Sequence, residues 1–131
     1  MTDTRFDVAL KADGRCTLRA EGFALETACA GGAGAPAATD LLAAALSSCI
    51  AATALPILAR HGLGPDDLGL RVTARRDAGD VPIALDVALR VSARVAPAVQ
   101  TRLLHAAARC PVRRALHPDL PVTVWLEQQS P

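Results

Sequence analysis

The sequence predicts an α+β fold, in which an antiparallel sheet with the element order βββαββαβ carries two helices on one face. Two groups of segments alternate apolar and polar residues, as strands with one buried face do. Two further segments repeat apolar residues every three to four positions, as helices do. The length of 131 residues fits a single domain, residues 1–131, with one core.

The first three strands are predicted at residues 4–11, 15–20 and 23–29. Their alternation is interrupted at Asp13-Gly14 and at Glu21-Gly22, which are typical turn pairs. Together they predict an antiparallel meander. The run AGGAGAPAA at 30–38 is too rich in Gly, Ala and Pro for either period, so it is predicted as a connection.

A long helix is predicted next, from Thr39 to His61-Gly62. Thr39 is the expected N-cap, and Asp40 then lies in the first turn, where a carboxylate suits the helix dipole. Gly62 supplies the stop signal. Pro56 falls inside the run and is expected to kink or restart the helix, because proline lacks a backbone donor.

Two strands follow, at 68–74 and 85–93, joined by the hairpin sequence RRDAGDVP. The second helix opens at Ala96-Pro97, with proline near the first helical position, and runs to Arg109. Residues 112–116 can form one more turn, and 121–126 alternate as a last strand.

The charge balance argues against a nucleic-acid partner. The 14 basic and 13 acidic residues leave a net charge of +1, so no global field attracts an anion. The basic pairs Arg75-Arg76 and Arg113-Arg114 lack interleaved aromatic residues for base stacking.

A membrane span is also not expected. The low-charge run at 41–59 is long enough, but its serines, its proline and its many alanines favour a helix buried in protein. The first residues, MTDTRFDVALKADG, do not form a secretory signal. We therefore expect a cytoplasmic protein with four reduced cysteines. No spacing of cysteines and histidines suits a metal site.

Two cysteines lie on predicted core stripes. Cys49 belongs to the stripe of the first helix and Cys110 to the inner end of the second, so the two thiols can lie close together. The alternative is that each is a small core hydrophobe without chemistry. The first stripe is Leu42, Ala45, Leu46, Cys49 and Ala52, and the second is Val99, Leu103, Ala106, Ala107 and Cys110.

Cys110 has local features that favour reactivity. With Pro111 as the first residue of a short helical turn, Cys110 is its N-cap, where free backbone donors lower the pKa of a thiol, and Arg113 and Arg114 follow. Cys49 lies within a helix and needs a cation from elsewhere. The candidates are Arg5, Arg15 and Arg19.

The run PAATDLLAAALSSCI at 36–50, followed by CPVRRAL at 110–116, resembles the osmotically inducible protein C and organic hydroperoxide resistance family, OsmC/Ohr. The CPV motif resembles the OsmC-like branch. The resemblance implies an intertwined homodimer and reduction of organic hydroperoxides without a metal or other cofactor. It also implies that Cys49 is the peroxidatic cysteine, that Cys110 is the resolving cysteine, and that a dithiol of the lipoyl type is the reductant.

The same resemblance makes Arg15 and Asp40 the candidates for the arginine and the carboxylate that activate Cys49. Asp40 precedes Cys49 by nine positions, half a turn out of phase on a regular helix, so its alternative role is helix capping. For the whole chain, the alternative is a non-catalytic dimer that binds or senses a small apolar ligand. Cys16 and Cys29 receive no role, and His105 is either a proton-transfer residue beside Cys110 or an exposed helix residue.

Overall fold

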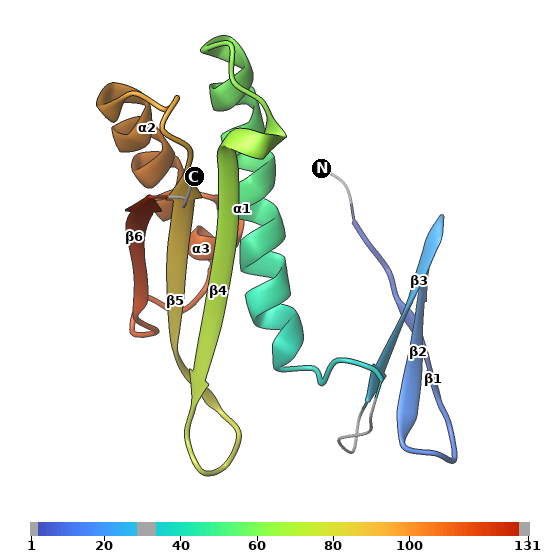
Figure 1. Ribbon diagram of the computed structural model, residues 1–131. Coiled ribbons are helices and arrows are strands. Elements are labelled where there is room, and N and C mark those ends of the chain that lie inside the picture. Colours follow the sequence, from blue (N-terminus) through green and yellow to red (C-terminus); the bar gives the residue numbers. More distant parts are fainter. Residues whose placement is uncertain (1–2, 29–33, 129–131) are drawn as a thin grey trace. The chain divides into compact units, whose positions relative to one another are not determined.

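The computed structural model describes residues 3–28 and 34–128, which form two compact units, Met1–Leu42 and Ala43–Pro131. The α+β class and the predicted element order are confirmed, with two short helices, η1 and α3, in addition to the long ones (Figure 1). Each unit carries one three-stranded sheet. The single sheet of the prediction is therefore two sheets.

The N-terminal unit is the predicted meander. Strands β1 (Asp7–Leu10), β2 (Arg15–Ala20) and β3 (Phe23–Ala28) pair antiparallel in sequence order. Gly14 and Gly22 have φ angles of 85° and 91°, the left-handed region that glycine enters at least cost. The predicted turns at these two positions are confirmed.

One face of this sheet is apolar and exposed. Val8, Leu18 and Leu25 lie opposite one another across the three strands. Phe6 and Phe23 make an edge-to-face pair with ring centroids 5.7 Å apart. An exposed apolar face of this kind marks an interaction surface. The large exposed apolar residues of the unit are Phe6, Val8, Leu10, Phe23 and Leu25.

Helix α1 (Asp40–Arg60) begins where the sequence predicts, with Asp40 in the first turn, but the predicted side-chain cap is wrong. The Thr39 hydroxyl is buried and has no hydrogen-bond partner among the described residues, so Thr39 does not cap through its side chain. Instead, the Ala37 backbone N–H donates to Asp40 Oδ2 over 2.9 Å. The carboxylate of the first turn closes the entry to the helix.

The C-terminal end of α1 matches the prediction. Gly62 has a φ of 69°, and the Leu63 N–H donates to the Leu58 carbonyl over 2.9 Å, the wider bond of a Schellman motif. Pro56 does not restart the helix, because α1 is one element through it. By length and apolarity α1 is the one described helix that could cross a membrane.

The C-terminal unit holds η1 (Pro65–Asp67), β4 (Leu68–Arg76), β5 (Pro82–Val91) and β6 (Val122–Gln128). Strands β4 and β5 form the predicted antiparallel hairpin, but β6 pairs parallel to β5. The expectation of an all-antiparallel sheet is wrong here. The crossover through α2 and α3 returns the chain to the end of the sheet where β5 began, as parallel pairing requires.

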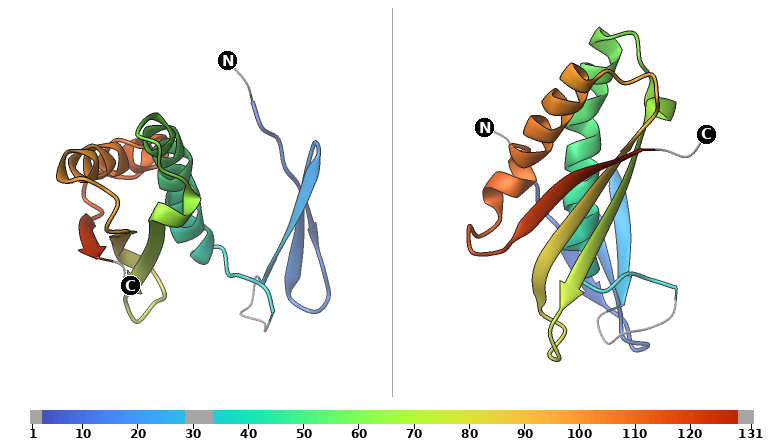
Figure 2. Two further views of the ribbon diagram at one scale, coloured as in Figure 1. Left: turned by 45° about the horizontal axis from the view of Figure 1, so that its top comes forward. Right: turned by 60° about the vertical axis from the view of Figure 1, so that its left-hand side comes forward.

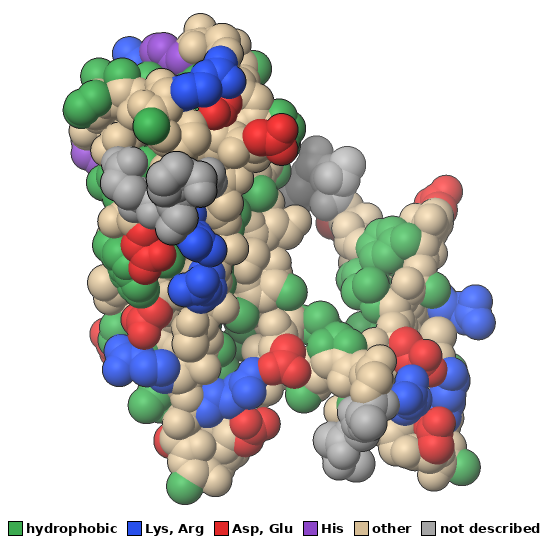
Figure 3. All heavy atoms as spheres, in the orientation of Figure 1, with side chains coloured by type: hydrophobic (Ala, Val, Ile, Leu, Met, Phe, Trp, Pro, Cys, Tyr) green, Lys and Arg blue, Asp and Glu red, His purple; other side chains and the backbone are tan. Residues whose placement is uncertain are grey.

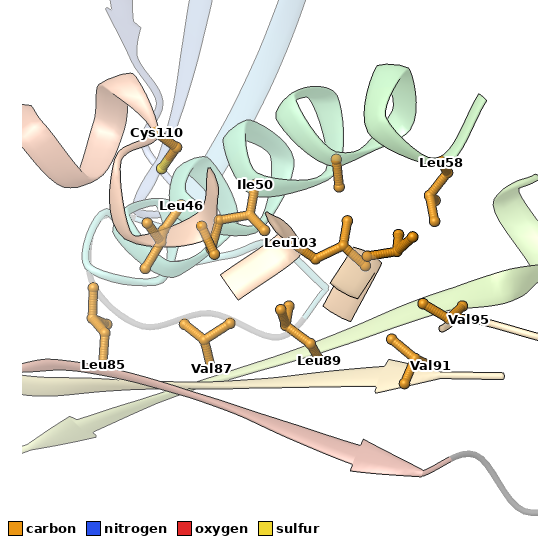
Figure 4. Close-up of a cluster of buried hydrophobic side chains, with 13 residues drawn as sticks. Leu46, Ile50, Leu58, Leu85, Val87, Leu89, Val91, Val95, Leu103 and Cys110 are labelled. Carbon is orange, nitrogen blue, oxygen red and sulfur yellow. The ribbon is translucent and has the colours of Figure 1, made fainter. Parts of the chain in front are cut away.

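Both long helices cover one face of this sheet (Figure 2). Alternate residues of β5 point into the core and meet α1 and helix α2 (Pro97–Ala108), as Figure 4 shows. Burying these side chains is the main favourable term for folding this unit. The largest fully buried side chains are Leu46, Ile50 and Leu58 on α1, Leu85, Val87, Leu89 and Val91 on β5, and Leu103 on α2.

The opposite face of the sheet carries charged side chains of both signs, which Figure 3 shows on the side toward the viewer. Arg75 pairs with Asp86 at 3.0 Å, and Arg90 with Glu127 at 3.9 Å. This face is therefore the solvent side of a half-buried sheet.

A buried carboxylate ties η1 to the end of β5. Asp67, 4% exposed, accepts hydrogen bonds from the Gly64 N–H at 2.9 Å and from the Ser92 hydroxyl at 2.7 Å. Arg94 lies 3.5 Å from the same carboxylate. The Gly64 N–H, then Ser92, hold the pKa of Asp67 below its ordinary value of 3.8, because they favour the charged form.

Asp67→Asn is expected to destabilise the protein at neutral pH. A lowered folded-state pKa contributes stability above the ordinary value, and this contribution is lost as pH falls through the folded value. Urea unfolding between neutral pH and about pH 3 should show the difference from wild type shrinking toward acid. Asp66→Asn, at the exposed neighbour, is the control and should change stability little. Equal stability of both variants at neutral pH would contradict this role.

Candidate thiol site

Cys49 lies in the middle of α1, between Leu46 and Ile50, both of which are fully buried. Its own side chain is half-buried and packs against the edge of the core. The predicted core stripe is therefore only partly correct: the buried stripe is Leu46, Ile50, Ala54 and Leu58, whereas Ala45 and Ala52 are exposed. Cys49 flanks the buried stripe, and so the residue is partly exposed.

Cys110 is the N-cap of α3 (Pro111–Ala115), as predicted. It is completely buried, and the Arg113 backbone N–H donates to its Sγ over 3.4 Å. Figure 4 shows its side chain at one end of the buried cluster, on the side of Leu46. The predicted stripe of α2 is confirmed at Val99, Leu103, Ala107 and Cys110.

The structure brings the two thiols together. The Cys49 side chain is close enough to Cys110 to influence the pKa of its thiol, and both cysteines are free thiols. The neighbouring Cys49 favours the protonated form of Cys110. The pair relates the middle of α1 to the start of α3.

Burial raises the pKa of the Cys110 thiol above its ordinary value of 9.0. The Arg113 N–H opposes this shift, and the neighbouring Cys49 adds to it. The expectation that the N-cap position lowers this pKa is wrong for the net effect, because desolvation outweighs the backbone donors. Burial thus disfavours the thiolate form of Cys110.

Arg15 and Asp40 belong to the N-terminal unit, and Cys49 to the C-terminal unit. The Arg15 guanidinium lies 3.6 Å from Glu26 and 3.9 Å from Asp13. Asp40 accepts the Ala37 N–H, which is the capping role considered as its alternative.

Glu26 is a residue that the sequence analysis missed. It pairs with both Lys11 and Arg15, and the hydrogen bond and charge of Lys11 hold the pKa of Glu26 below its ordinary value. The available signal was the meander register, which sets Glu26 opposite Thr17, two residues from Arg15 on β2. Its carboxylate orients the Arg15 guanidinium.

The other residues considered in the sequence analysis are not part of the Cys49–Cys110 pair. His105 is exposed on α2, which fits the second of its two predicted roles. Cys16 is 4% exposed and disulfide-bonded, which differs from the expectation of four reduced cysteines, and Cys29 lies outside the described residues. In the described part of the chain, no group of three or more His, Cys, Asp or Glu side chains could hold a metal ion.

Comparison with known proteins identifies similar folds along the whole chain. The family model described as OsmC-like protein matches residues 31–124. A putative osmotic stress induced and detoxification response protein from Psychrobacter arcticus has 20% identity and a TM-score of 0.82, covering 97% of this chain and 98% of its own.

Two organic hydroperoxide resistance proteins are also similar. OhrB of Bacillus subtilis has 19% identity and a TM-score of 0.61, covering 96% of this chain and 98% of its own. The protein OsmC from Legionella pneumophila has 16% identity and a TM-score of 0.63, with coverage of 96% and 97%. No curated protein sequence matched the chain.

The raised pKa of Cys110 predicts a loss of stability at alkaline pH. Its contribution is fully present below the ordinary thiol value of 9.0 and is lost as pH rises through the folded value, because only the unfolded thiol ionises in between. Cys110→Ala should cost about 1–2 kcal/mol at pH 7, since it removes a buried contact. Urea unfolding from pH 7 to 10 should show this cost shrinking.

Cys49→Ala is the matched control, because the Cys49 side chain is only half-buried, whereas that of Cys110 is completely buried. Between about pH 7 and 10, the pH dependence of the free energy of unfolding should be closer to wild type in Cys49→Ala than in Cys110→Ala. If the free energy of unfolding of Cys110→Ala depends on pH as that of wild type does, Cys110 ionises with an ordinary pKa in the folded protein.

Proposed function

Because this chain belongs to the OsmC-like protein family, we propose that it is a thiol-dependent peroxidase that reduces organic hydroperoxides in defence against oxidative or osmotic stress. The observation that carries the proposal is the contact between a half-buried Cys49 and a completely buried Cys110. A peroxide can reach the first thiol but not the second. The likeness to two organic hydroperoxide resistance proteins supports the choice of substrate class.

In the proposed reaction the Cys49 thiolate attacks one oxygen of the hydroperoxide, and the O–O bond breaks. Cys49 becomes a sulfenic acid, and the other oxygen leaves as an alcohol after taking a proton. The Cys110 sulfur then attacks the sulfenic sulfur, an S–S bond forms, and water leaves with the Cys110 proton. The contact between the two thiols in the reduced chain supports this second step, since a disulfide needs its sulfurs close.

The N-terminal unit supplies the proposed activating groups. We assign Arg15 as the cation that stabilises the Cys49 thiolate, held in orientation by Glu26. Asp40 supports the start of α1, the helix that carries Cys49.

A homodimer is part of the proposal, because each unit has an apolar surface that the described residues of the same unit do not cover. One is the exposed face of the β1–β3 sheet. The other is the exposed stripe of α1, which is Ala45, Ser48, Ala52, Leu55 and Ala59. Apolar faces of this extent favour association with a second chain.

Leu55→Arg is expected to weaken the dimer about tenfold or more, because Leu55 is 47% exposed on that stripe and would place a charge in the interface. Sedimentation velocity over a concentration series measures the effect. Val81→Arg is the control, since Val81 is 54% exposed in the turn before β5. If both variants sediment like wild type, α1 does not form the interface.

The proposed location is the cytoplasm, where a thiol pair is kept reduced between turnovers. The proposed electron donor is a dithiol, of which the lipoyl type is one. No metal or organic cofactor enters the proposed steps.

The deciding test is a mass measurement of the reduced protein after one equivalent of cumene hydroperoxide. A loss of two hydrogens, mapped to a Cys49–Cys110 disulfide, is the expected product within seconds. Dithiothreitol should then restore the thiols and sustain turnover. If both thiols of the pair are still intact after this treatment, the proposal is wrong.

Two single variants separate the roles of the cysteines. Cys49→Ser should lose peroxide reduction by at least about a hundredfold, since the accessible nucleophile is gone. Cys110→Ser should still react once and leave a sulfenic acid on Cys49, which dimedone traps. If neither variant reacts with the hydroperoxide even once, the assignment of Cys49 as the attacking thiol and Cys110 as the resolving thiol is contradicted.

A second candidate function is the non-catalytic binding of a small apolar ligand. An apolar groove of about 270 Å³ on the C-terminal unit favours it. The groove is lined by Ala51, Leu55, Leu58, Pro65, Leu68 and Leu70. This candidate gains if the thiols survive cumene hydroperoxide while a fluorescent fatty acid binds and Leu68→Arg abolishes that binding.

A further inference from the structure

Basic residues are concentrated in one segment next to the thiol pair. Between Asp86 and Asp119 the chain contains six arginines and no Asp or Glu, although the whole chain is nearly balanced. This segment includes α2 and α3, the two helices that flank Cys110. The charge is therefore segregated and not evenly spread.

The exposed side chains of Arg102, His105, Arg109 and Arg114 form what we call the basic face. The first three repeat at helical spacing on the side of α2 opposite the buried Val99, Leu103 and Ala107. None of the three arginines has a carboxylate within ion-pair distance in the described part of the chain. On the sheet, by contrast, Arg75 and Arg90 are paired.

The basic face lies on the segment that contains Cys110. Arg109 immediately precedes Cys110, and Arg114 lies on α3, whose N-cap is Cys110. Helices α1, α2 and α3 lie on the same side of the β4–β6 sheet (Figure 2). A partner on the basic face therefore contacts the two helices between which Cys110 lies.

We propose that the basic face docks an acidic surface of the protein that carries the reducing dithiol. The inference rests on the proposed function, because it names the partner that returns electrons to the oxidised pair. Unpaired cations at the docking site attract an acidic partner and raise its rate of association.

The electron transfer balances with a dithiol as reductant. One thiolate of the partner attacks the Cys49 sulfur, which is the accessible one, and the Cys49–Cys110 bond breaks. The Cys110 sulfur leaves within reach of the Arg113 N–H and takes up a proton. The second thiolate of the partner then attacks the mixed disulfide, releases Cys49, and leaves the partner oxidised by two electrons.

Nucleic acid fits the basic face less well than an acidic protein. The three aromatic residues of the chain are Phe6, Phe23 and Trp125, and all lie on or beside strands. The face therefore has no stacking platform for bases.

The test compares two synthetic dithiol peptides of equal length, one flanked by Glu and the other by Lys. Protein oxidised to the Cys49–Cys110 disulfide with diamide is mixed with each peptide, and the rate of thiol recovery is followed by alkylation and mass measurement. At about 25 mM salt the Glu-flanked peptide should react about tenfold faster. At about 500 mM salt the ratio should approach one, because salt screens exposed charges.

Arg102→Glu/Arg109→Glu should lose the preference for the Glu-flanked peptide, and Arg102→Gln/Arg109→Gln should retain part of it. Arg60→Glu/Arg71→Glu is the matched control, since it makes the same charge change at exposed positions on α1 and β4. Reduction by neutral dithiothreitol should stay within about twofold of wild type in every variant, which shows that the fold and the disulfide are intact.

Three outcomes would overturn the inference: equal rates for both peptides at low salt, an equal loss in the matched control, or a short DNA duplex that binds wild type more tightly than the Glu-flanked peptide. Failure of the proposed function gives a different result, because cumene hydroperoxide then forms no disulfide while diamide still does. The peptide comparison decides the inference in either case.

Discussion

The burial of Cys110 against the C-terminal core is the constraint on which the site depends. The same cluster that holds β5 against α1 and α2 removes this thiol from water and fixes it beside Cys49. Desolvation disfavours the thiolate of Cys110 and so raises the pKa of this thiol. The two thiols differ in depth, because Cys49 is half-buried and Cys110 is completely buried.

The geometry of α3 follows from the same requirement. Pro111 cannot continue α2, and the chain turns at Cys110 into a new helical turn. The Arg113 N–H then satisfies the sulfur that the core has desolvated. The crossover through α2 and α3 also returns the chain for parallel pairing of β6 with β5, so one segment serves both the sheet and the thiol site.

The chain has two exposed apolar surfaces and one exposed basic surface, and we assign a different kind of partner to each kind of surface. The exposed stripe of α1 and the exposed face of the N-terminal sheet suit a second copy, because apolar area is hidden only by another apolar surface. The basic face suits a transient partner, because exposed charge speeds association while adding little to affinity. A reductant that must leave after each turnover fits the second kind of surface.

The sequence by itself determined the α+β class, the order of the elements, the turns at Gly14 and Gly22, the end of α1 and the N-cap role of Cys110. Each of these depends on residues close in sequence, whose backbone preferences and periodicity are local. The LLAAALSSC and CPV motifs resemble those of the OsmC/Ohr family, and this resemblance made Cys49 and Cys110 the candidate site residues.

Only the tertiary structure decided the rest. The parallel pairing of β6, the exposure of Ala45 and Ala52, the pairing of Glu26 with Arg15 and the direction of the Cys110 pKa all depend on neighbours distant in sequence. Local reasoning gave the N-cap donors at Cys110 and predicted a lowered pKa. It could not count the side chains of α1, β5 and α2 that exclude water from the sulfur, and that exclusion outweighs the donors.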